Sequence, residues 1–196
     1  MHIAQNQYQS IQHSVHSVVI RLNRMMDKLR EFDISRRNIF MTDLDIRQPV
    51  IDDLVQIIEI EKNCFPIPWS QEIFLRITIT KGRFQVDDDV FIIMKVLARQ
   101  SYVIGYVIWE ESVYEEHGHI LNLAIREDER CRGNGSLILN HALNRMRDAG
   151  MRTCELEVRE SNQEARSLYS RAGMVAVDRV KGYYDVEDAI IYAIEF

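Results

Sequence analysis

The stretch Leu121-Asn122-Leu123-Ala124-Ile125-Arg126-Glu127-Asp128-Glu129-Arg130-Cys131-Arg132-Gly133-Asn134-Gly135-Ser136 decides how we interpret the rest of the chain. It begins as a short apolar run, continues as a charged turn, and ends with two glycines before an amphipathic segment. The first N–H groups of a helix have no partner within the helix, and the helix dipole places partial positive charge there. Glycines let a bulky anion approach the backbone, so the pattern suits a strand, a phosphate-binding loop and a helix.

Spacing excludes two commoner nucleotide-binding loops. The sequence contains no G-x-x-x-x-G-K-[ST] motif, and the dinucleotide fingerprint would need a third glycine at position 138, where Ile138 stands. Arg130 and Arg132 would add positive charge beside the loop amides. A tight turn that binds no ligand explains Gly133 and Gly135 equally well, so this stretch alone leaves both interpretations open.

The composition suits one main globular domain. The chain has 196 residues, 46% of them hydrophobic, and contains three prolines and no Gly/Ser run that would mark a linker. Its net charge of −6 argues against a nucleic-acid partner and suits a cationic one, such as a peptide N-terminus. No apolar run is long enough to span a bilayer, so we expect no membrane partner. The three cysteines stand in unrelated contexts and indicate free thiols of a reducing cytoplasm.

Residues 1–40 differ from the rest of the chain. Apolar residues recur there at helical spacing, which predicts one long amphipathic helix. Three interpretations compete: an extension for packing, partner binding or self-association, a targeting segment, and a natural start at Met41 that would make the segment incidental. We favour a helical extension over residues 1–40, followed by a domain over residues 41–196.

From Met41 onward, strands and helices alternate. Expected strands cover 44–47, 90–98, 102–110, 119–125, 153–158, 175–183 and 189–195. Expected helices cover 51–63, 70–81 and 136–149, and a fourth begins at the capping box Ser161-x-x-Glu164 and ends at Gly173. This order predicts an α/β (α+β) fold in which about four helices surround a mixed central sheet of about seven strands.

Two elements near the end of the chain carry residues that could do chemistry. Alternation along the strand 153–158 sends Glu155 and Glu157 to one face and the apolar residues to the other. A carboxylate there could accept a proton from an amine, directly or through water, although a solvated polar face is the competing interpretation. In the next helix, Tyr169 shares an inward-facing apolar stripe. A phenol beside a departing thiolate would be a general acid, whereas most buried tyrosines pack and hydrogen-bond.

Taken together, these motifs resemble the GNAT acetyltransferases. Arg130-x-x-Gly133-x-Gly135 resembles their [QR]-x-x-G-x-[GA] acetyl-CoA loop. Leu156-Glu157-Val158-Arg159-x-Ser161-Asn162, with Leu168-Tyr169 and Gly173, resembles the L-E-V-R-x-S-N…L-Y…G block of protein N-terminal acetyltransferases, especially the bacterial enzymes that modify a ribosomal-protein alanine. The segment 65–70 and the ending Gly182-Tyr183-Tyr184…Glu187-Asp188-Ala189 are similar too, so the resemblance covers residues 44–196.

The resemblance implies a GNAT fold and acetyl transfer from acetyl-CoA to the N-terminal α-amine of a ribosomal protein in the cytoplasm, with alanine as the expected first residue. It implies that Glu157 is the general base and that Tyr169 donates a proton to CoA, with a backbone N–H near Leu123 as oxyanion donor. The residues assigned to acetyl-CoA are Leu123, Ala124, Ile125, Arg130, Cys131, Arg132, Gly133, Asn134, Gly135, Ser136 and Asn162. The residues assigned to the peptide groove, where packing is the alternative role, are Phe65, Trp69, Tyr183 and Tyr184.

The chain also departs from the family pattern. Glu127 replaces a frequent proline, Asn134 replaces an aliphatic residue, and the loop after Tyr184 is short, which leaves substrate choice open. The sequence His117-Gly118-His119-Ile120 is similar to archaeal and eukaryotic NatA catalytic subunits. We expect no metal, because a His-x-His on a strand without a third ligand is more typical of surface or pairing histidines. Lysine or small-amine acetylation and a non-catalytic CoA-binding module are the alternative functions.

Overall fold

The structure is a computed structural model that describes residues 44–196. These residues belong to a single compact unit. The helix expected over residues 1–40, and its role as an extension, lie outside the described residues. Within residues 44–196, no helix has both the length and the apolar character that crossing a membrane requires.

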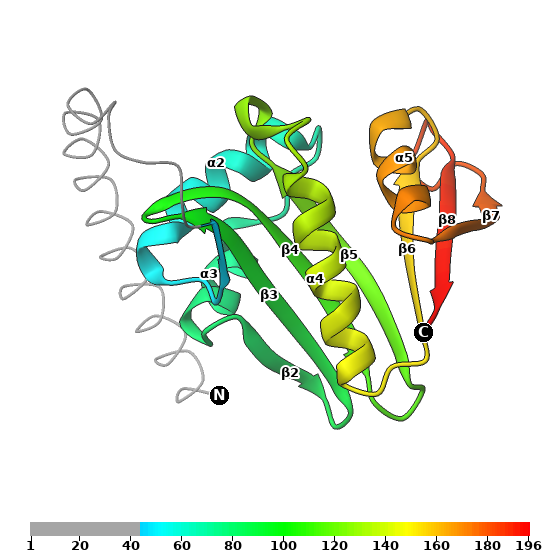
Figure 1. The fold of residues 1–196 in the computed structure, drawn as a ribbon, viewed down its shortest axis with the longest axis horizontal. Coiled ribbons are helices and arrows are strands. Elements are labelled where there is room, and N and C mark those ends of the chain that lie inside the picture. The colour runs from blue at the N-terminus through cyan, green and yellow to red at the C-terminus, as the bar shows by residue number, and fades with distance from the viewer. Residues whose placement is uncertain (1–43) are drawn as a thin grey trace, which may run out of the picture. The chain divides into compact units, whose positions relative to one another are not determined.

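Eight strands of the described chain form one sheet (Figure 1). They are β1 (Leu44–Arg47), β2 (Arg83–Asp87), β3 (Val90–Arg99), β4 (Tyr102–Ser112), β5 (His117–Ile125), β6 (Thr153–Arg159), β7 (Val175–Val180) and β8 (Ala189–Glu195). The strand order is β1-β3-β4-β5-β6-β8-β7, and β2 also pairs with β3. Among the described strands, β5 and β6 are parallel and every other pair is antiparallel. The predicted mixed sheet is therefore confirmed.

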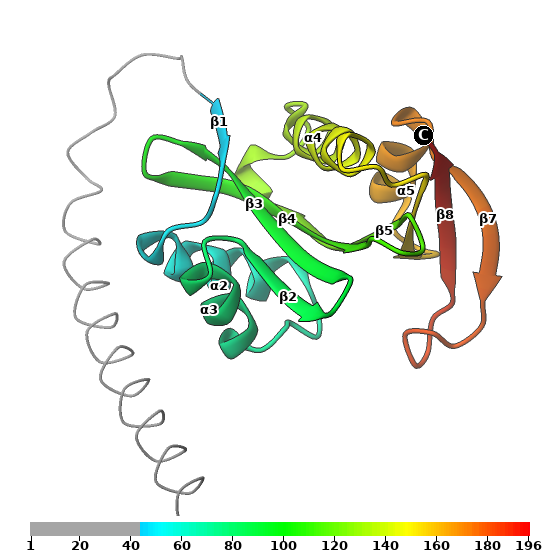
Figure 2. The same cartoon turned by 90° about the horizontal axis from the view of Figure 1, so that it is seen from below.

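Helices cover both faces of the sheet (Figure 2). On one face lie α2 (Leu54–Cys64) and α3 (Gln71–Ile79), and on the other lie α4 (Asn134–Asp148) and α5 (Gln163–Arg171). There are also two short 3-10 helices in the described chain. η1 (Ile51–Asp53) lies directly before α2, and η2 (Glu127–Glu129) lies before the loop that leads into α4, called the α4 loop below. Each α-helix turns an apolar stripe to the sheet, which is why the spacing of apolar residues predicted all four.

The hydrophobic core has one layer on each face of the central strands. β3 and β4 are buried on both faces, as their nearly continuous apolar sequences require. On the α2 and α3 side, Ile57 and Phe74 are fully buried. On the α4 side, Ile138, Leu139 and Met146 are fully buried. This double layer fixes the central strands as the frame on which the loops are held.

The sheet opens between β5 and β6. The two strands pair from His117 opposite Thr153 to His119 opposite Glu155 and then diverge (Figure 1). A bulge in β5 lies at this point, because Asn122 and Ile120 pair with consecutive residues of β4 and Leu121 is left without a partner there. The Arg126 N–H bonds the Ile104 carbonyl on β4 at 2.9 Å. By alternation, the N–H of Leu123 points away from β4 and into the opening.

Several predicted boundaries were wrong for identifiable local reasons. The helix expected from residue 136 begins at Asn134, directly after the left-handed Gly133. The strand expected over 175–183 ends at Val180, so Tyr183 lies in the following turn. The Ser161 capping box is wrong, because the Asn162 side chain caps α5 by accepting the Ala165 N–H at 3.1 Å. Strand β2 was missed, since its five residues are mostly exposed and only weakly apolar.

Candidate active site

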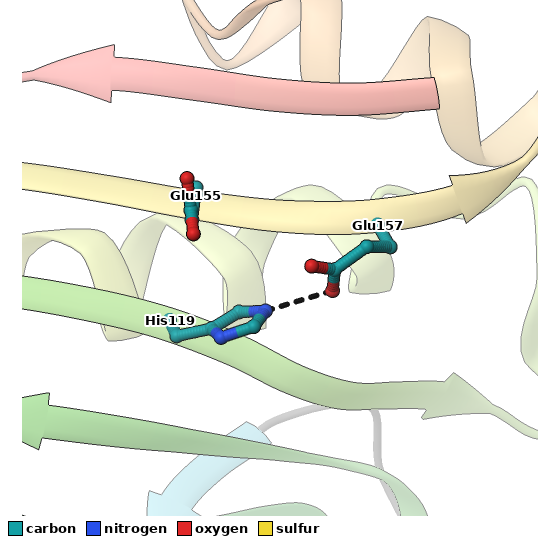
Figure 3. Close-up of side chains that lie close together, drawn as sticks. All are labelled: His119, Glu155 and Glu157. Carbon is teal, nitrogen blue, oxygen red and sulfur yellow. Dashed lines mark hydrogen bonds and ion pairs between the residues drawn. The ribbon is translucent and has the colours of Figure 1, made fainter. Parts of the chain in front are cut away.

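A hydrogen-bonded pair of side chains lies where β5 and β6 part (Figure 3). The Nε2 atom of His119 on β5 is 2.8 Å from Oε2 of Glu157 on β6. The two side chains are 23% and 18% exposed, so both are shielded yet reachable by solvent. The hydrogen bond from His119 lowers the pKa of Glu157, and the same bond raises the pKa of His119. The carboxylate is therefore ionised at neutral pH beside an imidazole that keeps its proton to a higher pH than usual.

Strand alternation builds this pair from two short motifs. Glu155 and Glu157 share one face of β6, as predicted, and His117 and His119 share one face of β5. The Nε2 atom of His117 lies 3.5 Å from Oε1 of Glu155, next to the contact between His119 and Glu157. Ligand atoms of His119, Glu155 and Glu157 lie within 4.8 Å of one another, a spacing that a cation could bridge. The histidines do pair with carboxylates, but the expectation that no further ligand lies near the His-x-His was wrong. The expected absence of a metal stays a prediction.

Tyr169, the second predicted catalytic residue, lies in a cluster of tyrosines. It projects inward from α5, is 8% exposed, and its ring centroid is 5.8 Å from that of Tyr192. Burial raises the pKa of Tyr169, and the neighbouring Tyr184 adds to the shift. Burial also raises the pKa of Tyr184 to about 12, with further contributions from Tyr183 and Glu157. The pKa of Tyr184 thus responds to the charge of Glu157, and that of Tyr169 responds to Tyr184.

The loop before α4 presents backbone amides, as its glycines predicted. Gly133 has φ of 83° and caps α4, and the first helical hydrogen bond runs from Leu137 N–H to its carbonyl at 3.0 Å. The N–H groups of residues 134–136 precede that bond and are free to meet an anion. A Cβ built at Gly133 would meet nothing within 4 Å, so the space above the loop is open. A Cβ built at Gly135 would lie 3.4 Å from Leu168 of α5, in ordinary van der Waals contact, so this glycine faces α5 rather than open space.

Polar side chains of this loop turn inward and brace it. Arg130 donates from Nε to the Ile125 carbonyl at 3.1 Å and from a terminal nitrogen to Cys64 Sγ at 3.2 Å. Asn134 is buried and donates to the Glu129 carbonyl at 2.9 Å. Arg132 remains mostly exposed, 3.3 Å from Glu129. Of the side chains assigned to acetyl-CoA on this loop, those of Arg130 and Asn134 hold the backbone in place, and the backbone itself faces the opening.

The other residues assigned to the cofactor divide in the same way. Ala124 and Ile125 are buried. By the same alternation, the backbone groups of Ala124 point to β4, whereas the N–H of Ile125, like that of half-buried Leu123, points away from β4. Asn162 has its side chain occupied as the cap of α5. Cys131 is exposed in the left-handed conformation, with φ of 58°, and Ser136 is half-buried at the start of α4. These residues lie on the loop before α4 and at the end of β5, except Asn162, which lies between β6 and α5. Their contact with acetyl-CoA stays a prediction.

Residues assigned to the peptide groove occupy two loops. Phe65 and Trp69 are half-buried between α2 and α3, where the Trp69 ring lies 6.2 Å from Phe74. Tyr183 and Tyr184 meet edge to face at 4.9 Å in the β7–β8 loop. The guanidinium of Arg159 lies 4.2 Å from the Tyr184 ring centroid, so this loop is pinned to the end of β6.

Sequence reasoning missed two residues that the structure places in or beside this site. His119 was treated as a surface or pairing histidine, yet its partner is the predicted base. The available signal was the matching period of His-x-His and Glu-x-Glu on two consecutive strands. Glu61 was not singled out, although it is 1% exposed behind the Phe65 to Ser70 loop. Helical spacing already placed Glu61 next to apolar Ile57 and Ile60, which is an unusual position for an unpaired carboxylate.

The diverging parallel strands, the loop of free amides at a helix N-terminus and the shielded carboxylate define a class of enzyme, the N-acyltransferases that use an acyl-CoA. The sequence profile of the acetyltransferase (GNAT) family matches residues 54–174, more than half of the chain. The chain belongs to this family, and its fold prediction is confirmed. GNAT acetyltransferases use acetyl-CoA, which confirms the predicted co-substrate.

Curated relatives narrow the similarity further. The chain is 28% identical over 149 residues to the ribosomal protein bS18-alanine N-acetyltransferase of Salmonella typhimurium, covering 72% of this chain and 90% of the relative. It is 31% identical over 132 residues to the enzyme of the same name from Haemophilus influenzae, covering 67% and 82%. The crystal structure of the ribosomal-protein-S18-alanine N-acetyltransferase from Escherichia coli matches with a TM-score of 0.64 at 25% identity, over 78% of this chain and 94% of that one.

Proposed function

We propose that this protein transfers the acetyl group of acetyl-CoA to the α-amine of an N-terminal alanine on a ribosomal protein in the cytoplasm. The observation that carries the proposal is the Glu157–His119 pair, held where β5 and β6 diverge beside the N–H of Leu123. The names of the bacterial relatives supply the substrate class, since each refers to the alanine of ribosomal protein bS18.

The Glu157–His119 pair is a better base for the amine proton than the Glu157 carboxylate alone. A free α-amine has a pKa of about 7.7 to 8.0, so part of it is already neutral near pH 7 and can attack, and a base is needed for the proton that the nitrogen sheds as the C–N bond forms. Glu157 alone is a weak base for this proton, because its pKa is lowered from an ordinary 4.5. When His119 is neutral, the proton accepted by Glu157 can be shared with an imidazole whose pKa is raised from 6.5 towards that of the amine. The pair therefore acts as one base, directly or through a water.

The neutral amine nitrogen attacks the thioester carbonyl carbon, and the Glu157–His119 pair accepts the proton that the nitrogen then releases. Charge develops on the carbonyl oxygen, and the Leu123 N–H, which points into the opening, is the group we assign to stabilise it. Collapse of the intermediate re-forms the carbonyl and breaks the C–S bond, with CoA leaving as a thiolate. The acetyl group is then on the amine, and the amine proton is on the Glu157–His119 pair.

Tyr169 is the group we assign to the departing sulfur. A thiol has a pKa near 8.5, about 1.5 units below an ordinary phenol at 10, so complete proton transfer from a phenol is uphill even before burial raises the Tyr169 pKa further. The phenol therefore stabilises the thiolate by donating a strong hydrogen bond while the sulfur charge builds. Final protonation of the sulfur can follow after CoA leaves the site.

The α4 loop and the aromatic loops would position the two reactants. The free N–H groups of residues 134–136, supported by the positive end of the α4 dipole, suit the pyrophosphate of acetyl-CoA. Trp69 and Phe65 on one loop, and Tyr183 and Tyr184 on the other, would flank the first residues of the peptide. Positioning two bound reactants in this way can supply a large part of the rate.

The test follows thiol release from acetyl-CoA with a peptide that carries a free N-terminal alanine. The same peptide with a blocked N-terminus and an internal lysine is the substrate control, and Glu155→Gln is the matched control for Glu157→Gln. We expect turnover of the first peptide, reduced about 100-fold or more by Glu157→Gln and much less by Glu155→Gln. Activity confined to the lysine peptide would overturn the proposal.

A further inference from the structure

Glu61 is a buried carboxylate that the proposed reaction does not use. It lies in the last turn of α2, between that helix and the sheet, and is 1% exposed. Removing a charged group from water is costly unless several donors replace the lost hydration. The groups that donate hydrogen bonds to Glu61 therefore indicate its role.

Three donors converge on Glu61 from three different elements. Its Oε1 accepts the Trp69 backbone N–H at 2.7 Å. Its Oε2 accepts the Tyr106 hydroxyl of β4 and, at 3.2 Å, the Asn122 amide of β5. Burial raises the pKa of Tyr106 well above its ordinary value, and the charge of Glu61 adds to this shift, so the phenol keeps its proton and remains a donor.

The Trp69 contact matters because its loop has few other backbone anchors. The segment between α2 and α3 contains Pro66 and Pro68, which have no N–H to donate. The Phe65 N–H bonds the Glu61 carbonyl at 3.0 Å, and the Trp69 N–H bonds the Glu61 carboxylate. Both ends of this proline-containing turn are thus held by the same residue.

The Asn122 contact connects this loop to β5, the strand whose Leu123 N–H we assign to the thioester of acetyl-CoA. Asn122 directly follows the β5 bulge at Leu121 and directly precedes Leu123, whose N–H points into the opening. A shift of Asn122 would move that N–H relative to the thioester. One carboxylate therefore links the loop assigned to the peptide and the strand assigned to the acetyl group.

We propose that Glu61 is a positioning residue that sets the spacing between the Phe65 to Ser70 loop and the bulge of β5, and so governs peptide binding. The proposal rests on the proposed function, because it concerns the peptide side of that reaction. It assigns Glu61 no contact with either substrate: it acts through Trp69 and Asn122.

Glu61→Gln tests the role of the charge at constant size. The single NH₂ group of the new amide must replace one of the two oxygens, where it faces either the Trp69 N–H or the Tyr106 and Asn122 donors. Glu61→Gln/Asn122→Asp returns a carboxylate to the cluster from the opposite side, where the glutamine amide can donate to it. Glu59→Gln is the matched control, since Glu59 lies on the same helix with its side chain 54% exposed.

We expect Glu61→Gln to raise the KM for the alanine peptide about tenfold, the effect of losing one hydrogen bond to a charged group. The KM for acetyl-CoA should stay within about twofold, and the double variant should recover most of the peptide KM. An unchanged peptide KM would overturn the proposal. So would equal rises in both KM values accompanied by a lower Tm, because that pattern indicates a role in folding alone.

A spectroscopic readout separates this proposal from the function on which it rests. Trp69 emission, taken as the difference between each protein and its Trp69→Phe counterpart, should shift to the red in Glu61→Gln and not in Glu59→Gln. If the emission shifts in Glu61→Gln but the wild type does not turn over the peptide, the proposed function is wrong and the contact of Glu61 with the Phe65 to Ser70 loop is still supported. If the wild type turns over the peptide but Trp69 emission is unchanged in Glu61→Gln, the positioning role of Glu61 is wrong. Should Glu61→Gln fail to fold, Tyr106→Phe replaces it, and an unchanged peptide KM there overturns the proposal.

Discussion

The Nε2 atom of His119, the last residue of β5 that pairs with β6, lies 2.8 Å from Oε2 of Glu157, two residues beyond the last paired residue of β6. The bond joins the two strands at the point where their backbone ladder ends. It therefore shifts both pKa values and also fixes the position of the carboxylate at the mouth of the opening. These two consequences can be separated by experiment.

The first prediction concerns pH. His119 has a raised pKa, so it keeps its proton up to a pH above 6.5 and the pair can accept the amine proton only above that point. At low pH, log(kcat/KM) for the alanine peptide should fall with a limiting slope of about two, one proton from the pair and one from the amine. In His119→Gln the slope should be about one. Identical slopes in both proteins would show that His119 does not titrate in catalysis.

The second prediction concerns the leaving group. Tyr169→Phe removes the phenol that we assign to the departing sulfur, while the ring still packs against Tyr192. We expect kcat to fall about 100-fold, the cost of losing one donor to a developing anion, with little change in the KM for acetyl-CoA. Tyr114→Phe, at a residue that is 84% exposed in a turn, is the matched control. Steady-state kinetics in which both variants match the wild type would contradict the assignment.

The third prediction concerns the phosphate loop. Gly133 and Gly150 have φ of 83° and 92°, and a Cβ at either would meet nothing within 4 Å. Alanine at each position should therefore lower the free energy of unfolding by a similar amount, about 1 kcal/mol. Gly133→Ala alone should also raise the KM for acetyl-CoA, since it disturbs the free amides before α4. Equal KM values for the two variants would argue against a phosphate site at Gly133.

The fourth prediction concerns the β7–β8 loop. The Glu187 carboxylate accepts the Ser161 N–H at 2.8 Å and an Arg159 N–H at 3.1 Å, and Arg159 in turn lies over Tyr184. The Ser161 bond lowers the pKa of Glu187, so this tie is complete at neutral pH and is lost as the pH falls through the lowered value. Glu187→Gln should raise the KM for the peptide at neutral pH, whereas Glu164→Gln, in the first turn of α5, should not. Peptide titrations of the two variants make this comparison.

Periodicity predicted most of the fold because the elements are amphipathic and their burial follows the pattern. The alternation of β6 placed Glu157 on the polar face, and the apolar stripe of α5 turned Tyr169 inward, as the structure confirms. The two glycines marked the α4 loop because a left-handed residue is needed at Gly133. The helix predicted over residues 1–40 lies outside the described part of the chain and stays a prediction.

Contacts between elements were beyond the reach of sequence reasoning. The matching periods of His-x-His and Glu-x-Glu indicate that the two pairs can face each other, but which histidine meets Glu157 depends on the register between β5 and β6. The inward turn of Arg130 depends on Cys64, which is far away in the sequence and close only after folding. Competition between caps also misled the prediction: Asn162 and Ser161 can both cap a helix, and Glu187 takes the Ser161 N–H.

The position of the acetyl group on the product tests the central claim most directly. One peptide that carries both a free N-terminal alanine and an internal lysine would be incubated with acetyl-CoA and the wild-type protein, and the product would be sequenced by tandem mass spectrometry. We predict acetyl on the α-amine alone, in a yield that Glu157→Gln lowers and Glu155→Gln largely preserves. Acetyl on the lysine ε-amine, or an α-amine yield that Glu157→Gln leaves unchanged, would contradict the account.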